Sequence, residues 1–332
     1  MSIPDSFKAF RINRQQGQHE AAWSTVTSNQ LSAGDVHVKV HYSSINYKDA
    51  LAGTGRGKIL RQYPLNGGID VAGEVILSES ADFKPGDKVL ATGCGLSETR
   101  DGGLAEYIKL DSKWVIPLPE SLSLLQAMQL GTAGFTAALS LYRMEQNGQT
   151  PDMGPVVVTG ATGGVGSIAV NMLSQLGYEV NAITGKIDEF DWLRELGAIQ
   201  CIDRHNLFLG DQPLEASTWA GAIDTVGEPL LSGLTRVIKP WGSIASCGMA
   251  GGWHINTTVM PFIIRGISLL GINSAQCPTP LRKKLWKNLS KQWLPKELGN
   301  ICQSIITPDA LPNFFNTMLA GKNTGRIVVK IT

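Results

Sequence analysis

The sequence predicts an α/β protein of two domains, one built on a doubly wound parallel sheet and the other rich in antiparallel β-structure. Three observations lead to this fold class. The chain has 332 residues, more than one hydrophobic core usually holds. Short β-rich runs fill its first part. After about residue 125, strand-like and helix-like segments alternate, which is typical of a parallel sheet with helices on both faces.

The first part of the chain is predicted to form an antiparallel β domain. Its short runs are rich in β-branched residues and are separated by glycines and by the turn Lys-Pro-Gly-Asp at 84–87. These runs span 36–45, 68–77, 87–92 and 104–110. The last run, 325–332, is of the same kind, so we expect it to return to this domain. The β domain is therefore predicted to consist of residues 1–125 and 271–332.

Residues 126–270 are predicted to form the parallel α/β domain. Within 166–176, apolar residues four apart lie on one helix face, and a glycine follows as a stop signal. The strand candidates span 155–160, 178–184, 198–203, 221–227, 242–248 and 267–273. The last of these, ISLLGIN, is apolar and would aggregate as an open sheet edge, so we expect a homodimer.

Composition excludes several classes of protein. The 29 Lys and Arg residues nearly balance the 28 Asp and Glu residues, which argues against a dedicated binder of nucleic acid or of membrane surfaces. The start of the sequence lacks the pattern of a signal peptide, and no run of about 18 apolar residues occurs. The five cysteines are far apart and odd in number. We expect a cytoplasmic protein with reduced, structural cysteines.

A glycine triplet predicts a dinucleotide site. In VVVTGATGGVG (156–166), Gly160, Gly163 and Gly166 stand between an apolar strand and an amphipathic helix. Glycines there allow a tight turn and close approach of the backbone to a pyrophosphate, which the helix N-terminus attracts. The alternative is a glycine turn that serves only the packing of helix against strand.

The end of the second strand of this domain favours NADPH. An NAD site keeps a carboxylate roughly 20 residues after the glycines, whereas an NADP site has cationic and hydroxyl groups there. This sequence has Thr184, Gly185 and Lys186, and no carboxylate before Asp188. Thr184 and Lys186 could donate to a 2′-phosphate. The alternative is that Lys186 is an ordinary solvated lysine.

The chain resembles the medium-chain dehydrogenase/reductase superfamily over essentially its whole length. The resemblance rests on FKPGDKV (83–89), GGLAEYIKL (102–110), GTAGFTAAL (131–139) and VTGATGGVG (158–166). Further segments, 43–59, 67–75, 219–227 and 257–266, resemble its zinc-free quinone-oxidoreductase branch, and more narrowly the bacterial NADPH-dependent acryloyl-CoA reductases. The resemblance implies a Rossmann nucleotide-binding domain and a GroES-like catalytic domain.

The resemblance also implies that both zinc sites of the metal-dependent relatives are missing. Where those relatives have a Cys and a His-Glu pair, this sequence has Asn46 and the run 68–70 (Gly-Ile-Asp). Of the cysteine-rich lobe that binds a structural zinc, only Cys94 lies in the corresponding region. We therefore expect no bound metal.

The run Asn46-Tyr47-Lys48-Asp49 supplies the candidate catalytic residues. Strand alternation places Asn46 and Lys48 on one face of this run and Tyr47 and Asp49 on the other. The resemblance places Tyr47 beside the nicotinamide and Asn46 at the metal-ligand position, where it could orient a thioester oxygen. The alternative for Tyr47 is a packed ring whose hydroxyl bonds to the backbone. Lys48 and Asp49 are interpreted as scaffold, with Lys48 as the partner of Asp70.

Two further groups of residues are candidate ligand contacts. Arg56, Lys58 and Arg61 share a Gly-rich loop without a nearby acid, which suits the phosphates of coenzyme A; a solvated face is the alternative. The resemblance alone implies additional cofactor contacts at Thr162, Gly164, Val165, Arg204, Met249, Ile263, Ser274 and Arg326.

These features lead to a hypothesis for the reaction. NADPH would give hydride to the β-carbon of acryloyl-CoA, hydrogen-bond donors would hold the enolate-like oxygen, and a proton would add at the α-carbon to give propanoyl-CoA. Two alternatives stay open. One is a quinone or enone reductase without a coenzyme A requirement, and the other is a non-enzymatic NADPH-binding redox sensor.

Overall fold

The computed structural model describes residues 2–332, which divide into two compact units. Unit 1 contains the residues up to Thr132 together with Ala275–Ser290 and Cys302–Thr332, and unit 2 contains Ala133–Ser274 and Lys291–Ile301. The predicted boundaries lie a few residues earlier at both joints, and they place Lys291–Ile301 in the β domain. That segment groups with unit 2 because its helix α8 (Leu298–Ile301) packs on α3 (Gly164–Gln175).

A three-stranded antiparallel sheet begins unit 1. Its strands, in sheet order, are β2 (Gln18–Thr27), β1 (Ser6–Gln15) and β4 (Leu65–Asn66). In the turn between β1 and β2, Gln16 and Gly17 have φ of 50° and 82°, the positive values that a two-residue hairpin with right-handed twist requires. The sequence prediction omits this hairpin because its strands carry many charged and polar residues.

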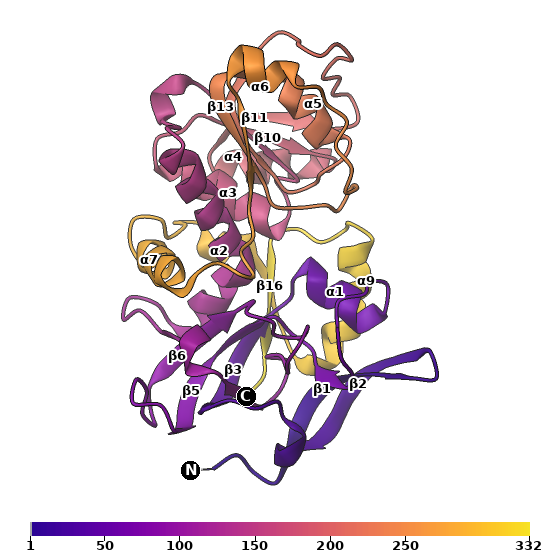
Figure 1. Ribbon diagram of the computed structural model, residues 1–332, viewed down its shortest axis with the longest axis vertical. Helices are drawn as coiled ribbons and strands as arrows, with labels where there is room; N and C mark the ends of the chain where they lie inside the picture. Colours follow the sequence, from indigo (N-terminus) through magenta and orange to yellow (C-terminus); the bar gives the residue numbers. More distant parts are fainter. Residues whose placement is uncertain (1) are drawn as a thin grey trace. The chain divides into compact units, whose positions relative to one another are not determined.

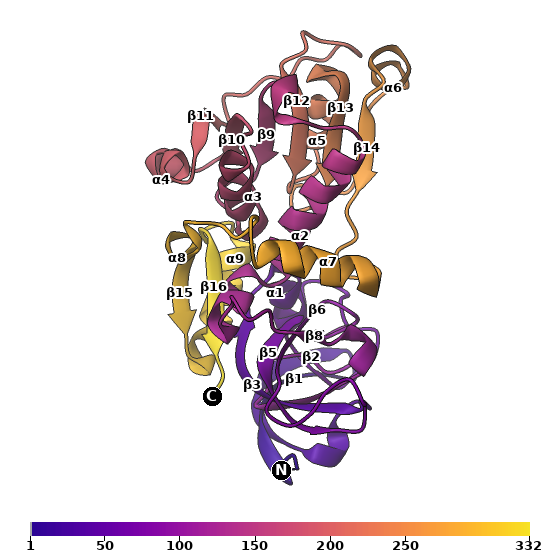
Figure 2. The same cartoon turned by 90° about the vertical axis from the view of Figure 1, so that its left-hand side faces the viewer.

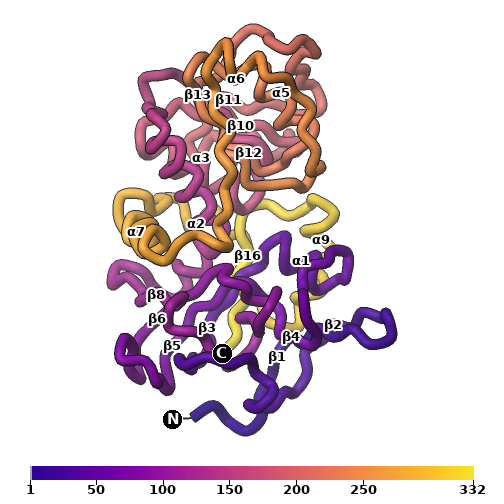
Figure 3. Tube along the Cα trace, in the orientation of Figure 1, coloured from indigo at the N-terminus to yellow at the C-terminus, as the bar shows by residue number. Residues whose placement is uncertain are grey.

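The larger sheet of unit 1 has seven strands in the order β15-β16-β3-β5-β6-β8, with β7 also paired to β3. As predicted, the last strand returns to this sheet: β16 pairs antiparallel with β3, and Val328 lies opposite Ser44. Figure 3 shows this yellow C-terminal strand beside the indigo and purple part of the chain. The strands span Val36–Ser44 (β3), Asp70–Ser78 (β5), Lys88–Thr92 (β6), Tyr107–Leu110 (β7), Ile116–Pro117 (β8), Cys302–Ile306 (β15) and Arg326–Lys330 (β16).

Helices α1 (Tyr47–Thr54), α7 (Thr279–Leu289) and α9 (Leu311–Leu319) also belong to unit 1 (Figure 1). Helix α1 packs on α9, where Gly53 leaves room for the ring of Phe315. Phe315, Phe10 and Ile45 belong to one buried apolar cluster, which extends beneath α1 through Ala50 and Ala52. Apolar burial therefore fixes one face of α1.

Unit 2 contains a parallel six-stranded sheet. In sheet order its strands are β11 (Ala198–Asp203), β10 (Val180–Thr184), β9 (Val156–Thr159), β12 (Trp219–Asp224), β13 (Ile238–Ser246) and β14 (Ser268–Gly271) (Figure 2). Counted along the chain, this order is third, second, first, fourth, fifth, sixth, which is that of a doubly wound nucleotide-binding fold. The predicted fold class is confirmed.

Helices pack on both halves of this sheet. Helix α3 contacts β9, β10 and β11, and α5 (Leu230–Val237) contacts β12 and β13. Two short helices, α4 (Phe190–Glu195) and α6 (Met260–Arg265), pack on β11 and β13. The loops that follow β9, β10 and β11 lie at the carboxyl ends of these strands, as in other doubly wound sheets.

Helix α2 (Leu124–Gln146) bends at Gly131, whose φ of 51° and ψ of −153° are not helical. A second helical segment starts after this kink at Thr132. Among residues 2–332, no helix has the length and apolar character needed to span a bilayer.

Candidate active site and cofactor-binding residues

The glycine-rich loop of unit 2 joins β9 to α3, as predicted. Gly160 has a φ of 58°, and its carbonyl accepts the Gly163 N–H at 2.9 Å. A side chain at Gly166 would collide with this same carbonyl oxygen. Glycine at these positions therefore serves both the tight turn and the close approach of the loop to the helix.

The first turn of α3 presents backbone donors. Gly163 is the N-cap, and the first helical bond runs from the Ser167 N–H to the Gly163 carbonyl at 2.9 Å. The N–H groups of Gly164, Val165 and Gly166 consequently have no acceptor within the helix. Together with the helix dipole, they form a favourable site for a phosphate group.

Two threonines hold the loop that follows β10. The hydroxyls of Thr162 and Thr184 lie 3.0 Å apart and are buried, and Thr184 Oγ1 also accepts the Lys186 N–H at 3.2 Å. Thr162 and Thr184 thus fix the backbone that carries Lys186. The expected contacts of these two threonines with the cofactor stay predictions.

Basic side chains gather at the ends of β10 and β11. A side-chain carbon at Gly185 would lie 2.6 Å from Arg204 Nε and 2.8 Å from His205 Nε2. Lys186 follows directly and is half-buried, and this burial lowers the pKa of its ammonium group. The structure thus brings Arg204 next to the predicted Gly185–Lys186 turn. It also adds His205, which the sequence prediction missed although it follows Arg204 directly.

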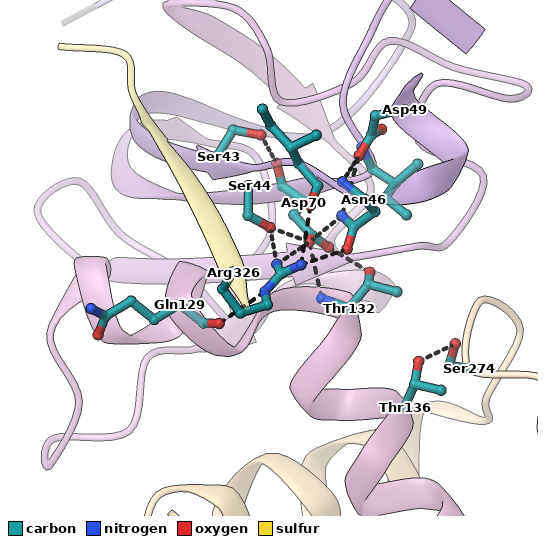
Figure 4. Close-up of polar contacts among 12 residues, drawn as sticks. Ser43, Ser44, Asn46, Asp49, Asp70, Gln129, Thr132, Thr136, Ser274 and Arg326 are labelled. Atoms are coloured by element: carbon teal, nitrogen blue, oxygen red, sulfur yellow. Dashed lines mark hydrogen bonds and ion pairs between the residues drawn. The ribbon is translucent and has the colours of Figure 1, made fainter. Parts of the chain in front are cut away.

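The other predicted residues of unit 2 are spread over its later loops. Met249 follows β13, Ile263 lies in α6, and their side chains are 68% and 76% exposed. Ser274 lies beyond β14, and its hydroxyl accepts the Thr136 hydroxyl at 2.8 Å (Figure 4). Their contacts with a cofactor stay predictions.

In unit 1 the polar run begins a helix and is not a strand. Asn46 is the N-cap of α1, and the Asp49 carboxylate accepts the Asn46 backbone N–H at 2.9 Å, which forms a capping box. The predicted separation of these residues by strand face is therefore wrong. The pattern Asn-x-x-Asp is a helix start signal, and continuing the preceding β-branched run across it causes the error.

Tyr47 is the first residue of α1, and its side chain is 42% exposed. Its hydroxyl has no hydrogen-bond partner among residues 2–332. The alternative interpretation, a packed ring with its hydroxyl bonded to the backbone, does not match this environment. The hydroxyl is available to an outside acceptor.

Asp70 lies at the centre of a buried polar cluster (Figure 4). Its carboxylate is fully buried and accepts four hydrogen bonds, from Ser44 Oγ (2.5 Å), Asn46 Nδ2 (2.8 Å), the Thr132 N–H (2.9 Å) and Thr132 Oγ1 (2.5 Å). Its counter-charge is Arg326, with Nη2 3.9 Å from Oδ2. The burial of this carboxylate is thus compensated by donors and by charge.

The predicted partner of Asp70 is wrong. Lys48 Nζ binds Glu98 Oε2 at 2.6 Å instead. Because α1 is helical, Lys48 points away from the buried cluster, whereas Asp49 lies inside, 1% exposed, and accepts the Ile69 N–H at 2.9 Å. Asp49 thus has the scaffold role that the sequence predicts.

Arg326 has an internal role that differs from its expected cofactor contact. The side chain is 3% exposed and donates to the carbonyls of Gln129 and Ile45, to Asn46 Oδ1 (3.2 Å) and to Ser44 Oγ (2.7 Å). A cofactor contact would break these bonds, so we remove Arg326 from the proposed cofactor contacts.

Asn46 is likewise occupied. Its Nδ2 donates to Asp70 (2.8 Å) and Asp49 (3.2 Å), and its Oδ1 accepts from Arg326. Neither amide hydrogen is left for a substrate oxygen. These bonds argue against the expectation that Asn46 orients a thioester oxygen.

The cationic loop after α1 is only partly free. Arg61 Nη2 pairs with Glu98 Oε1 at 3.0 Å, which corrects the expectation of a loop without a nearby acid. Glu98 is distant in sequence, so this pair is not visible in the run itself. Arg56 and Lys58 are exposed and have no ion-pair partner within the described chain.

Metal ligands are not clustered. Between residues 2 and 332, no group of three or more His, Cys, Asp or Glu side chains could hold a metal ion. The expected absence of zinc stays a prediction, which elemental analysis of purified protein would check.

We expect Gly131→Ala to destabilise the protein by roughly 3 kcal/mol. At this position a side-chain carbon would lie 2.6 Å from Asp70 Oδ2, 2.7 Å from Ser44 Oγ and 2.8 Å from Arg326 Nη2, and φ is positive. Gly148→Ala is the matched control, because its φ of 87° is also positive but no atom lies within 4 Å. Urea denaturation measures the free energy of unfolding of both variants. Equal losses of that free energy in the two variants would show that the polar cluster adds no steric constraint at Gly131.

Asp49 makes stability depend on pH. Burial, and then the charge of Asp70, raises the pKa of Asp49 to about 7 from an ordinary 3.8. Because folding raises this pKa, the proton stabilises the folded state fully below about pH 4, and that stabilisation disappears as pH rises through about 7. We expect the free energy of unfolding to fall between about pH 4 and pH 7 more steeply in the natural protein than in Asp49→Asn. Parallel pH curves would contradict this assignment.

Two family descriptions match the chain. Residues 32–120 match the "Alcohol dehydrogenase GroES-like domain" and residues 164–291 match the "Zinc-binding dehydrogenase" family. "Acrylyl-CoA reductase AcuI" of Ruegeria pomeroyi is 40% identical over 328 residues, covering 98% of this chain and 99% of that protein. "Putative quinone oxidoreductase YhfP" of Bacillus subtilis is 44% identical over 326 residues, with the same two shares.

Solved structures agree with this result. The crystal structure of Escherichia coli K-12 YhdH with bound NADPH has a TM-score of 0.94 at 41% identity, covering 98% of this chain and 100% of that one. The structure of Bacillus subtilis yhfP with NAD bound has a TM-score of 0.93 at 43% identity, covering 98% and 99%. The chain therefore belongs to the medium-chain dehydrogenase/reductase superfamily of oxidoreductases, in the branch of the quinone oxidoreductases and acrylyl-CoA reductases.

Proposed function

We propose that this protein reduces the activated double bond of acryloyl-CoA, or of another short 2-enoyl-CoA, to the saturated thioester with NADPH. The observation that carries the proposal is the exposed Tyr47 hydroxyl, which has no partner among the described residues and stands on the capped first turn of α1. The name of the Ruegeria relative supports the substrate class, and the NADPH bound to the Escherichia coli protein supports the cofactor.

The residues of unit 2 fit NADPH. The N–H groups of the first turn of α3 suit the pyrophosphate, and the loop needs glycine where a side chain would collide with backbone. Lys186 and Arg204 place positive charge at the turn after β10, where His205 also lies, and this charge suits a 2′-phosphate better than a bare ribose hydroxyl. When bound there, the cofactor supplies the hydride.

In unit 1, Tyr47 holds the substrate oxygen. Negative charge develops on the thioester oxygen as the β-carbon is reduced, and a hydrogen bond from the Tyr47 hydroxyl stabilises that charge. Helix α1 adds to this effect because Tyr47 lies at its positive N-terminal end. One preorganised donor of this kind contributes about 3 kcal/mol to transition-state stabilisation.

Arg56 and Lys58 are the proposed contacts for coenzyme A phosphates. Both are exposed and carry unpaired positive charge, whereas Arg61 is drawn to Glu98. Flexible cations attract phosphates without requiring a fixed geometry. Neutral quinones would gain nothing from these residues.

The second candidate function is reduction of quinones or enones that lack coenzyme A. The name of the Bacillus relative favours it. Steady-state NADPH oxidation with acryloyl-CoA beside 1,4-benzoquinone separates the two. A higher kcat/KM with the thioester supports the proposal, and a higher value with the quinone supports the alternative. Tight NADPH binding without turnover of either compound would instead indicate a redox sensor.

We also propose a homodimer that forms through the edge of the unit 2 sheet. Strand β14 ends the strand order, and Leu269 on it is 39% exposed. Trp241, on the neighbouring strand β13, is 75% exposed. We expect Leu269→Lys to raise the dimer dissociation constant at least about 10-fold in sedimentation equilibrium, because a buried unpaired charge costs several kcal/mol. An unchanged constant, or a natural protein that sediments as a monomer, would contradict this interface.

A further inference from the structure

We propose that the buried pair Asp70–Arg326 positions Tyr47 for the reaction by locking the amide of Asn46. This inference rests on the proposed role of Tyr47. The pair lies in the interior of unit 1, where Asp70 is 0% and Arg326 3% exposed, and it has no direct contact with the substrate in the proposed reaction. Its effect on the reaction passes through Asn46 and the first turn of α1.

Segments that are distant in the sequence converge on Asp70. Its four donors come from the end of β3 (Ser44), from the cap of α1 (Asn46) and from the segment after the kink in α2 (Thr132) (Figure 4). Gly131 permits this approach, because any side chain there would enter the cluster. A carboxylate held by so many donors has one well-defined position.

The charge pair also fixes the orientation of the Asn46 amide. Its Nδ2 faces the Asp70 carboxylate at 2.8 Å and its Oδ1 faces the Arg326 guanidinium at 3.2 Å. Rotation of the amide by half a turn would set oxygen against carboxylate and NH2 against guanidinium. The two opposite charges therefore select one orientation of Asn46.

Hydrogen bonds to the backbone connect the fixed Asn46 to the position of Tyr47. The Asn46 backbone N–H bonds to Asp49, whose other carboxylate oxygen accepts the Ile69 N–H at 2.9 Å. On the other side, Arg326 Nη1 binds the carbonyl of Ile45 at 3.1 Å. The charge pair thus holds the backbone at Ile45 and Asn46, directly before Tyr47, and so limits the positions that the Tyr47 hydroxyl can reach.

Apolar side chains could stabilise the fold as well as this charge pair does, because the cost of removing two charges from water offsets much of their attraction. Directional control is what the pair adds. If it is lost, α1 keeps its apolar contacts with α9, but its first turn can shift. A misplacement of about 1 Å at a reacting group is enough to lower a rate roughly 100-fold.

The test is a double-mutant cycle between Asp70→Asn and Tyr47→Phe. In the natural background we expect Asp70→Asn to lower kcat roughly 10- to 100-fold while the Kd for NADPH changes less than about 2-fold. In the Tyr47→Phe background we expect no further loss. Equal losses in both backgrounds would overturn the inference, because Asp70 would then act independently of Tyr47.

Asp101→Asn is the matched control. Asp101 is also a buried carboxylate of unit 1, 2% exposed, and pairs with Arg11 at 2.8 Å without touching α1. We expect this variant to lower thermal stability but to leave kcat per folded molecule unchanged. A kcat loss in Asp101→Asn equal to that in Asp70→Asn would reduce the proposed effect to general destabilisation.

Labelling with 3-fluorotyrosine separates this inference from the proposed function. The chain has six tyrosines, and Tyr47→Phe identifies the Tyr47 signal by its loss. We expect Asp70→Asn to shift or broaden that signal and to leave the others in place. If Tyr47→Phe leaves kcat unchanged, the proposed role of Tyr47 fails, whereas an unperturbed Tyr47 signal in Asp70→Asn overturns the positioning.

Arg326→Lys covers the case that Asp70→Asn does not fold. A lysine keeps the positive charge but cannot reproduce the fork of directed bonds to Ser44, Ile45 and Asn46. We expect the same selective change of the Tyr47 signal and a kcat loss that vanishes in the Tyr47→Phe background. A folded Arg326→Lys protein with natural kcat and an unchanged signal would overturn the inference.

Discussion

Tyr47→Phe is expected to lower kcat with acryloyl-CoA about 100-fold. The substitution removes only the hydroxyl, so the ring and the start of α1 stay in place. The lost bond matters mainly in the transition state, where the thioester oxygen carries most charge, so kcat should fall more than KM changes. Stopped-flow measurement of NADPH oxidation at saturating substrate gives the rate of the chemical step.

Tyr107→Phe is the control for this prediction. Tyr107 lies in β7 of the same unit, and its ring packs edge-on against Phe7, with centroids 5.5 Å apart. Its hydroxyl has no part in the proposed mechanism, so kcat should be unchanged. If both variants have natural kinetics, Tyr47 must be removed from the mechanism.

The second large effect concerns cofactor choice. Lys186→Ala and Arg204→Ala are each expected to weaken NADPH binding roughly 10- to 100-fold, because a hydrogen bond to a charged group contributes about 1.5–3 kcal/mol. NADH lacks the 2′-phosphate, so its affinity should change little. Fluorescence titration with both nucleotides measures the ratio of their Kd values.

Arg194→Ala serves as the control for cofactor choice. Arg194 is an exposed cation of unit 2 that already pairs with Asp191 at 2.6 Å. Its loss should leave the ratio of NADPH to NADH affinity unchanged. If Lys186→Ala weakens both nucleotides equally, the lysine acts through the structure of the loop. A natural protein that binds NADH more tightly than NADPH would contradict the cofactor assignment itself.

The parallel domain follows closely from the sequence. Its strands are apolar and bounded by glycines, so local pattern is enough to find β9 to β14. The glycine loop is equally local, because Gly160, Gly163 and Gly166 serve one turn. Arg204 entered only through resemblance and His205 was missed, since their approach to Gly185 depends on the neighbouring strand.

The polar cluster is harder to predict, because its partners lie far apart in the chain. Arg326 meets Asp70 only after the last strand has paired with β3. Lys48 is nearer in sequence, but the helical start at Asn46 turns it toward Glu98. One wrong local choice, strand instead of helix at Tyr47, therefore produced the wrong partner for a buried carboxylate. Capping patterns such as Asn-x-x-Asp are the signal that would have corrected it.

The most direct test follows the hydride. The protein is incubated with acryloyl-CoA and NADPH that carries deuterium at both C4 positions, and the product is analysed by mass spectrometry and NMR. The proposed reaction predicts propanoyl-CoA with one deuterium, located on the β-carbon, and a solvent-derived hydrogen on the α-carbon. The proposal would be contradicted by unlabelled propanoyl-CoA or by deuterium on the α-carbon. It would also be contradicted if the protein formed no propanoyl-CoA but reduced quinones rapidly in a parallel assay.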